Sequence, residues 1–159
     1  MHFHAEPMKP ARSLDLCNCF GVRQAARRIT RLYEKHFAPV HLTSAQFSIL
    51  VALRQQPHPT MNALAVEMGM DRTTLLRAIR PLQRKQLVLS KRRSQDTRQL
   101  LFSLSAGGRR KLDAATPLWE AAQAEFEAQV GATRAARLRH DLLQAAPEPA
   151  QENTKRVPV

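Results

Sequence analysis

Residues 71–110 read DRTTLLRAIRPLQRKQLVLSKRRSQDTRQLLFSLSAGGRR, and this stretch decides the fold. Extended to Lys111, it contains 12 of the 25 Lys and Arg residues but only two of the 13 acidic residues, so it carries +10 of the formal net charge of +12. The rest of the chain is nearly neutral. A charge concentrated in this way is typical of a protein that binds a polyanion, because neutralising phosphates releases condensed counterions.

The first part of this stretch has the pattern of an amphipathic helix. Five apolar residues recur at helical spacing and are expected to form its buried face: Leu75, Leu76, Ile79, Leu82 and Leu87. Asp71 precedes the helix and can cap it by accepting from the amide of Thr73 or Thr74. Pro81 lies inside the helix, where we expect a kink but no break, because the apolar spacing continues beyond it. The outward face is left with Arg72, Thr73, Arg77, Arg80 and Arg84.

A hairpin is predicted directly after this helix. Residues 88–92 and 99–104 have the composition of two strands, and the polar residues 94–97 form the turn between them. A basic helix followed by a basic-tipped hairpin is the layout of a winged helix-turn-helix. The helix fits a major groove, and the hairpin tip can reach the neighbouring minor groove.

Helices are predicted on both sides of this module. Their expected ranges are 13–37, 44–54, a short helix from Thr60 to Gly69, 105–130 and 133–145. Thr43 and Gln46 form a capping box at the start of the second of these helices. The long terminal helices cannot bury their apolar faces against so small a module, which favours a two-fold homodimer. We therefore predict a mainly α fold with a small β-hairpin wing, in which the winged helix-turn-helix module is flanked by long dimerisation helices.

The domain organisation follows from these elements. We expect a flexible N-terminal arm over residues 1–11, a single domain over 12–146 and a disordered tail over 147–159. Within the domain, the dimerisation helices occupy 12–42 and 105–146, and the DNA-binding module occupies 43–104. No apolar run reaches the length of a signal peptide or a transmembrane helix, so a cytoplasmic protein is expected.

These motifs resemble the MarR family of bacterial transcriptional regulators from about Leu16 to Ala145. The most specific match is Asp96-x-Arg98 followed by residues 103–105 and by Gly108-Arg109, which is similar to the family's wing signature. The resemblance implies a homodimer that binds a pseudopalindromic operator and is released by a small molecule or by oxidation. Members of the family are mostly repressors.

The same resemblance implies which residues bind DNA. Arg98 would enter the minor groove with Asp96 holding it, and Arg72, Thr73, Thr74 and Arg77 would line the major-groove face. Arg93 completes this predicted set: Arg72, Thr73, Thr74, Arg77, Arg93, Asp96 and Arg98. The chemistry agrees, because an arginine can donate two hydrogen bonds to guanine in the major groove and a narrow minor groove attracts arginine. The other cations, Arg80, Arg84, Lys85 and Lys91, are expected to contact phosphates or solvent.

The preferred effector is a small aromatic or phenolic acid bound where the first, second and fifth helices meet the DNA-binding module. Phe47 and Trp119 would form an apolar floor, although ordinary core or dimer packing also explains both residues. Arg23 would hold the carboxylate, and Tyr33 or Ser44 would add a hydrogen bond.

The alternative signal is oxidation of Cys19. A cysteine at this position, fourteen residues before Tyr33, resembles the organic-hydroperoxide sensors of the same family, although their second tyrosine is replaced here by Ser44. Arg23 lies one turn away, where its positive charge would attract a thiolate at Cys19. The simpler interpretation is that Cys17 and Cys19 are small buried helix residues that cannot bridge each other, because residues i and i+2 of a helix point apart.

Other classes of function have little support. The chain lacks a Gly-rich phosphate loop and the short motifs of metalloproteases and serine hydrolases, so we expect neither an enzyme nor a cofactor or metal site. RNA binders usually present stacking aromatics on a sheet, and the only aromatic residue of the basic stretch, Phe102, should face the core. A non-specific nucleic-acid binder remains the less favoured alternative to a sequence-specific regulator.

Overall fold

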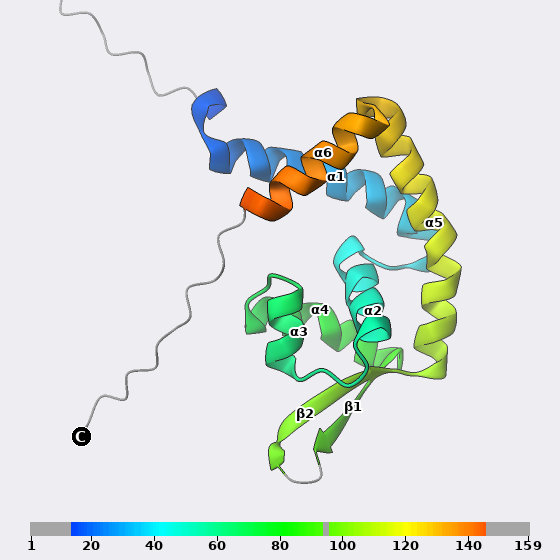
Figure 1. Ribbon diagram of the computed structural model, residues 1–159. Helices are drawn as coiled ribbons and strands as arrows, with labels where there is room; N and C mark the ends of the chain where they lie inside the picture. The colour runs from blue at the N-terminus through cyan, green and yellow to red at the C-terminus, as the bar shows by residue number, and fades with distance from the viewer. Residues whose placement is uncertain (1–13, 94–95, 146–159) are drawn as a thin grey trace, which may run out of the picture. The chain divides into compact units, whose positions relative to one another are not determined.

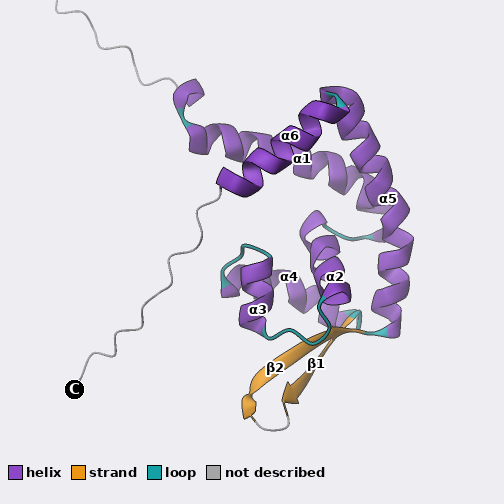
Figure 2. Ribbon diagram, viewed as in Figure 1, coloured by secondary structure: helices purple, strands orange, loops and turns teal. Residues whose placement is uncertain are grey.

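The computed structural model describes residues 14–93 and 96–145 (Figure 1). They form a mainly helical fold with one antiparallel hairpin, which confirms the predicted fold class (Figure 2). The elements in chain order are a 3-10 turn at Leu14–Leu16, α1 (Asn18–Phe37), a 3-10 turn at Ala38–Val40, α2 (Ser44–Gln55), α3 (Met61–Glu67), α4 (Arg72–Arg84), β1 (Val88–Arg93), β2 (Asp96–Leu104), α5 (Ala106–Val130) and α6 (Ala132–Ala145).

The chain divides into two compact units, Met1–Gln123 and Ala124–Val159. The first unit contains α1 to β2 and most of α5, and the second contains the end of α5 and α6. The predicted arm over 1–11 and the tail over 147–159 lie outside the described residues. The boundaries between dimerisation helices and DNA-binding module stay a prediction.

The core of the first unit lies where α2, α3, α4, the hairpin and the start of α5 meet. Its fully buried members come from every one of these elements and from the last turn of α1: Phe37, Ile49, Leu50, Leu64, Leu75, Ile79, Leu82, Val88, Phe102 and Leu112. Within α4 the predicted buried face is confirmed, because Leu75, Ile79 and Leu82 are buried and Leu76 is half-buried. Leu87 is also buried but lies beyond the helix, which ends at Arg84, so its predicted place on the helix is wrong. The α4 helix continues through Pro81 to Arg84, so the proline does not break it.

The predicted helix caps are present. Thr43 Oγ1 accepts from the Gln46 amide at 3.1 Å while the Gln46 side chain accepts from the Thr43 amide, which completes the capping box. Gly69 follows α3 with φ +57°, a conformation that favours glycine. The amides of Gly69 and Met70 donate back to the carbonyls of Val66 and Ala65, closing a Schellman motif that turns the chain from α3 into α4.

The hairpin is longer than the sequence predicted. Val88 pairs with Leu104 at its base, and the ladder reaches the Arg93–Asp96 pair after a register shift next to Arg92. The second strand therefore begins at Asp96, so the predicted start at residue 99 is wrong. The hairpin is also tied to α3, because the Phe102 amide donates to the Pro59 carbonyl at 3.0 Å and Thr60 forms a bridge with Leu101.

The first helix also begins later than predicted. Cys17 has extended backbone angles (φ −90°, ψ 108°) and caps α1, with its Sγ accepting from the Phe20 amide at 3.4 Å. Because Cys17 lies outside the helix, the helical-spacing argument against a bridge to Cys19 does not apply to this pair. Within the described residues, no helix is both long and apolar enough to cross a membrane.

Candidate nucleic-acid interface and effector cavity

The α4 helix turns one face into the core and presents the other to the surface. Leu75 and Ile79 are fully buried, whereas Arg72, Thr73, Thr74 and Arg77 are all exposed. The same helix therefore carries the apolar residues that fix its position and the polar residues predicted to contact DNA. The structure brings these four predicted residues together at the start of α4.

The first turn of α4 is held by Asp71. Its Oδ1 accepts from the Thr74 amide at 2.9 Å, and its Oδ2 accepts from the Thr74 hydroxyl at 2.6 Å. The Thr74 hydroxyl bond, followed by the Thr74 and Thr73 amides and the Arg77 charge, lowers the pKa of Asp71 below its ordinary value of 3.8. Since the Thr74 hydroxyl donates to this carboxylate, its oxygen is left only to accept from other groups.

Arg72 lies on the side of α4 that faces the hairpin. It borders a hollow of about 250 Å³ whose other lining residues are Thr60, Met61, Asn62, Leu76, Gln99, Leu100 and Phe102. The polar side chains of Asn62 and Gln99 thus share a recess with Arg72, although no pattern in the sequence singled them out. The hydrogen bond from the Phe102 amide of β2 to the Pro59 carbonyl, in the loop before α3, holds β2 beside the start of α3 and so places Gln99 near Asn62.

The hairpin residues of the predicted interface are only partly described. The backbones of Arg93 and Asp96 pair at the end of the ladder, and Arg98 follows within β2. The side chains of Arg93, Asp96 and Arg98 lie outside the described residues, so their DNA contacts stay predictions.

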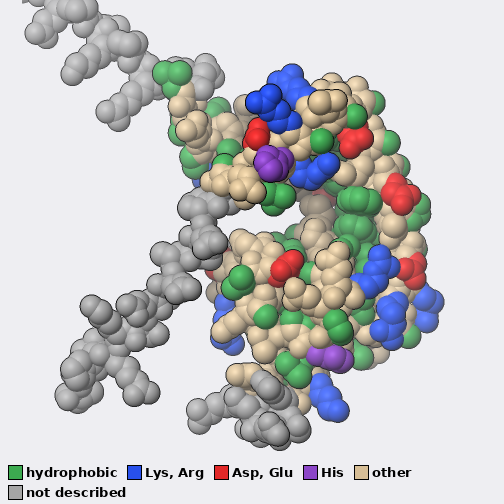
Figure 3. All heavy atoms as spheres, viewed as in Figure 1, with side chains coloured by type: hydrophobic (Ala, Val, Ile, Leu, Met, Phe, Trp, Pro, Cys, Tyr) green, Lys and Arg blue, Asp and Glu red, His purple; other side chains and the backbone are tan. Residues whose placement is uncertain are grey.

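The other cations of the basic stretch are exposed. Arg80, Arg84, Lys85 and Lys91 all lie at the surface, and Lys85 Nζ is 3.5 Å from the His41 carbonyl oxygen. Figure 3 shows further Lys and Arg side chains gathered beside the lower half of α5. Their exposure agrees with the predicted contacts to phosphates or solvent.

A second feature of the first unit is a cavity of about 500 Å³. It is lined by Tyr33, Phe37, Ser44, Phe47, Ser48, Val51, Ala52, Arg54, Gln55, Glu67, Met68, Thr116 and Trp119. Four of the predicted effector-binding residues, Tyr33, Ser44, Phe47 and Trp119, are therefore brought together. Its size falls within the usual range for small-molecule sites.

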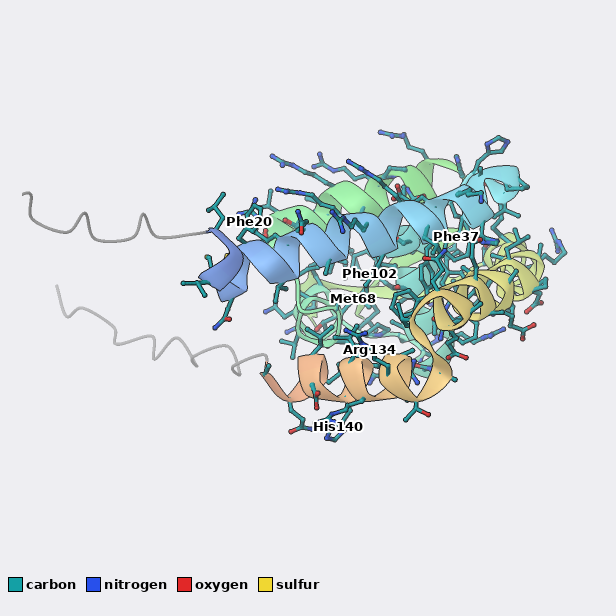
Figure 4. All side chains as sticks on the ribbon, turned by 90° about the horizontal axis from the view of Figure 1, so that it is seen from above. Phe20, Phe37, Met68, Phe102, Arg134 and His140 are labelled. Atoms are coloured by element: carbon teal, nitrogen blue, oxygen red, sulfur yellow. The ribbon has the colours of Figure 1, made fainter. Side chains whose placement is uncertain are left out.

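Aromatic rings form one wall of this cavity. Phe47 stacks on Phe37 with the ring centroids 4.8 Å apart, and it also stacks on Trp119 with the centroids 6.3 Å apart. Figure 4 marks Phe37, which ends α1, and Met68, which caps α3 and lines the same cavity. The Tyr33 hydroxyl donates to Oε1 of Gln123. The cavity thus combines a flat apolar wall with several hydroxyl groups.

Cys19 and Arg23 are not among the residues that line the cavity. Both lie near the start of α1 and are exposed, as is Cys17. The interpretation of both cysteines as buried helix residues is therefore wrong for the single chain, because both side chains are exposed and Cys17 precedes the helix.

Sequence reasoning missed several residues of the cavity. Val51 and Gln55 lie on the same face of α2 as Ser44 and Phe47, so helical spacing alone was a signal that could have found them. Glu67 and Met68 gave no such signal, because they come from α3. Arg54 was also missed, and its Nη1 lies 3.0 Å from Oδ1 of Asp113 on α5. The described residues contain no group of three or more His, Cys, Asp or Glu side chains placed to hold a metal ion.

Comparisons with known proteins agree with this geometry. A family model described as the MarR family matches residues 42–100. The M. tuberculosis transcriptional regulator MosR, in complex with DNA, is 38% identical, and the match covers 81% of this chain and 95% of that chain with a TM-score of 0.72. No curated protein sequence matches the chain significantly.

Two structures of the regulator CouR share the fold. CouR as a repressor bound to a 23-mer DNA duplex is 24% identical, over 89% of this chain and all of that chain, with a TM-score of 0.77. CouR from Rhodococcus jostii RHA1 bound to p-coumaroyl-CoA is 22% identical, over 84% and 94% of the two chains, with a TM-score of 0.68.

Proposed function

The chain belongs to the MarR family of DNA-binding transcriptional regulators, and on this premise we propose that it is a homodimeric repressor released from a pseudopalindromic operator by a small aromatic or phenolic acid. The observation that carries the effector part is the cavity bordered by Glu67 and Met68. Glu67 ends α3 and Met68 caps it, and only Gly69 and Met70 separate them from Asp71, the cap of α4, so a molecule in the cavity contacts the helix-turn-helix itself.

Operator recognition rests on the exposed face of α4. Arg72, Thr73 and Arg77 provide guanidinium and hydroxyl groups that can read base edges or bind phosphates. The net charge of the surrounding stretch supplies the sequence-independent part of the affinity. Arg98 on β2 adds a minor-groove contact by analogy with the wing signature. In a two-fold dimer the centres of the two half-sites would lie about 10 bp or a multiple of that apart.

Dimerisation is supported by apolar side chains that α1 and the turn before it leave at the surface. Leu14, Leu16 and Val22 are 61%, 84% and 52% exposed, and only Phe37 of α1 is buried. A second copy of the chain would cover this face. Sedimentation equilibrium should give a dimer that Val22→Glu weakens. The matched control is Val66→Glu, which charges an exposed valine of α3. A wild-type monomer at micromolar concentration would contradict the proposed dimer.

The main test is fluorescence anisotropy with the DNA that flanks the protein's own gene and with a scrambled duplex, at one near-physiological salt concentration. We expect tight binding to the flanking DNA only, and release by an aromatic acid from a panel of benzoates and cinnamates. Equal binding to both duplexes would leave a non-specific nucleic-acid binder. Specific binding that no acid weakens would refute the effector part alone.

A thiol-based hydroperoxide sensor is the second candidate function, because the Cys19 thiol is exposed and accessible to an oxidant. In this case an organic hydroperoxide releases the wild-type protein from DNA, while Cys19→Ser stays bound and a thiol reductant restores binding. Cys17→Ser is the matched control. Release of the Cys19→Ser variant by hydroperoxide would rule out Cys19 as the sensor.

A further inference from the structure

The lining of the 500 Å³ cavity contains one cationic side chain, Arg54, and one carboxylate, Glu67. Arg23 was predicted from the sequence to bind the effector's carboxylate, but it is not among the residues that line the cavity. Arg54 lies in the last turn of α2 and comes from the same helix as Ser44 and Phe47. It is therefore the guanidinium that a bound acid would meet.

Arg54 is already engaged by a residue outside the cavity. Its Nη1 donates to Asp113 Oδ1 at 3.0 Å, with 48% of the arginine side chain and 67% of the aspartate side chain exposed. Ion pairs so open to solvent contribute little to stability. A guanidinium has five N–H donors, and this bond uses one nitrogen. The pair is thus weak enough to be exchanged for another carboxylate.

Arg54 also borders a second hollow of about 430 Å³, together with His58, Arg109 and residues of the hairpin base. The same side chain therefore lines both the effector cavity and a recess beside the base of β2. A change in the position of the Arg54 side chain would therefore alter the lining of both hollows. Asp113 belongs to α5, so the ion pair joins α2 to α5 across 59 residues of sequence.

We propose that Arg54 recognises the carboxylate of the effector and that the effector draws it away from Asp113. This rests on the proposed function of the cavity. The acid lies with its ring against Trp119, which is 37% exposed, and its carboxylate on the Arg54 guanidinium. Asp113 is then a competitor for Arg54, and the unliganded protein holds α2 and α5 together through a contact that the effector replaces.

The rest of the lining narrows the chemical class of the effector. Glu67 would repel a second carboxylate but can accept from a phenolic hydroxyl. The stacked rings of Phe47 and Trp119 present a flat face to an aromatic ring. We therefore infer a hydroxylated aromatic monoacid in preference to a diacid or a neutral amide.

The test exploits the opposite signs expected for the two partners of the ion pair. Binding of 4-hydroxybenzoate, 4-hydroxybenzamide and terephthalate is measured by calorimetry and by the fluorescence of Trp119, the only tryptophan in the chain. Arg54→Gln should weaken 4-hydroxybenzoate binding roughly tenfold or more, because it removes a charge-assisted bond. Asp113→Asn should strengthen it by about two- to fivefold, because it removes the competitor. Arg110→Gln, an exposed arginine of α5 outside the cavity lining, should change nothing.

The outcomes separate the inference from the function on which it rests. Weaker binding in both the Arg54 and Asp113 variants would mean that the pair only holds the cavity in shape, and would overturn the inference. Unchanged binding in Arg54→Gln, or equal binding of the acid and its amide, would also overturn it while leaving the cavity as an effector site. Failure of every compound to bind the wild type would instead contradict the proposed aromatic-acid effector.

Discussion

Gly108, in the first turn of α5, fits against the backbone that joins α4 to the hairpin. A Cβ atom at this position would lie 2.1 Å from the Leu87 carbonyl oxygen and 3.3 Å from Leu104 Cδ2. The contact is fixed from both sides, because the Ser105 amide donates to the same Leu87 carbonyl at 3.1 Å and the Gly108 amide donates to Ser105 Oγ at 2.9 Å. Gly108→Ala must therefore move backbone and not the end of a flexible side chain.

Two opposing contributions determine how much stability Gly108→Ala loses. The Leu87 carbonyl would have to retreat by about 0.9 Å to reach 3.0 Å from the new methyl group. Forcing an extra methyl into packed structure costs about 1–3 kcal/mol, against which alanine gains up to about 1 kcal/mol of helix propensity. Allowing for the Ser105 bonds that would be strained as well, we expect a net loss of about 2 kcal/mol, or about 4–8 °C in melting temperature.

Gly107 provides the matched control, because it is the preceding residue of the same helix. A Cβ at Gly107 would meet Ser105 Oγ at 3.4 Å and Leu87 Cδ2 at 3.9 Å, which are ordinary contacts. Gly107→Ala should therefore be neutral or slightly stabilising. Thermal and urea unfolding of both variants, followed by circular dichroism at one fixed protein concentration, compare the two. If Gly108→Ala is as stable as Gly107→Ala, the reasoning from this contact is refuted.

Asp71 has a lowered pKa in the folded state, so its stabilisation is present above its unfolded pKa of about 3.8 and is lost as the pH falls through the lower folded value. Asp71→Ala should lower the melting temperature at neutral pH. Asp71→Asn can still cap the helix, but its melting temperature should fall less steeply than that of the wild type as the pH is lowered. An equally steep fall in both proteins would contradict the role of the carboxylate. Arg98→Ala should weaken operator binding by about 1–3 kcal/mol without changing the melting temperature, and an unchanged anisotropy titration would refute the wing assignment. Leu75→Ala, at a fully buried position of α4, should cost about 2–5 kcal/mol of unfolding free energy, and a loss below 1 kcal/mol in urea titrations would show that α4 is not anchored by this face.

Much of the fold could be predicted because its signals are local. Asp71, Thr43 and Thr60 are followed at three residues' distance by the amides that they cap, and the apolar residues of α4 repeat at the spacing of a helix. The errors arose where a local pattern was ambiguous. The extended backbone at Cys17 interrupts a helical pattern, and the polar residues 96–98 belong to β2 although their composition favours a turn.

The cavity could be predicted only in part. Phe47 and Trp119 were assigned to it from their type and from the expected meeting of helices, and the structure places both in its lining. Arg23 was predicted to supply the cation for the effector's carboxylate, yet it is exposed on α1 and is not among the residues that line the cavity. Arg54, which we propose in its place, has no sequence pattern around it that distinguishes it from other basic residues at the end of a helix.

The sequence by itself determined the basic module, because charge, helical period and capping residues act over a few residues and are read directly from their spacing. It also identified the family, through the motif of Asp96, Arg98 and Gly108. Only the tertiary structure decided which distant side chains meet. Arg54 reaches Asp113, and Trp119 stacks on Phe47, because the packing of α2 against the core and against α5 brings together residues far apart in the chain. Such pairings depend on the relative positions of whole helices, and no spacing along one segment encodes them.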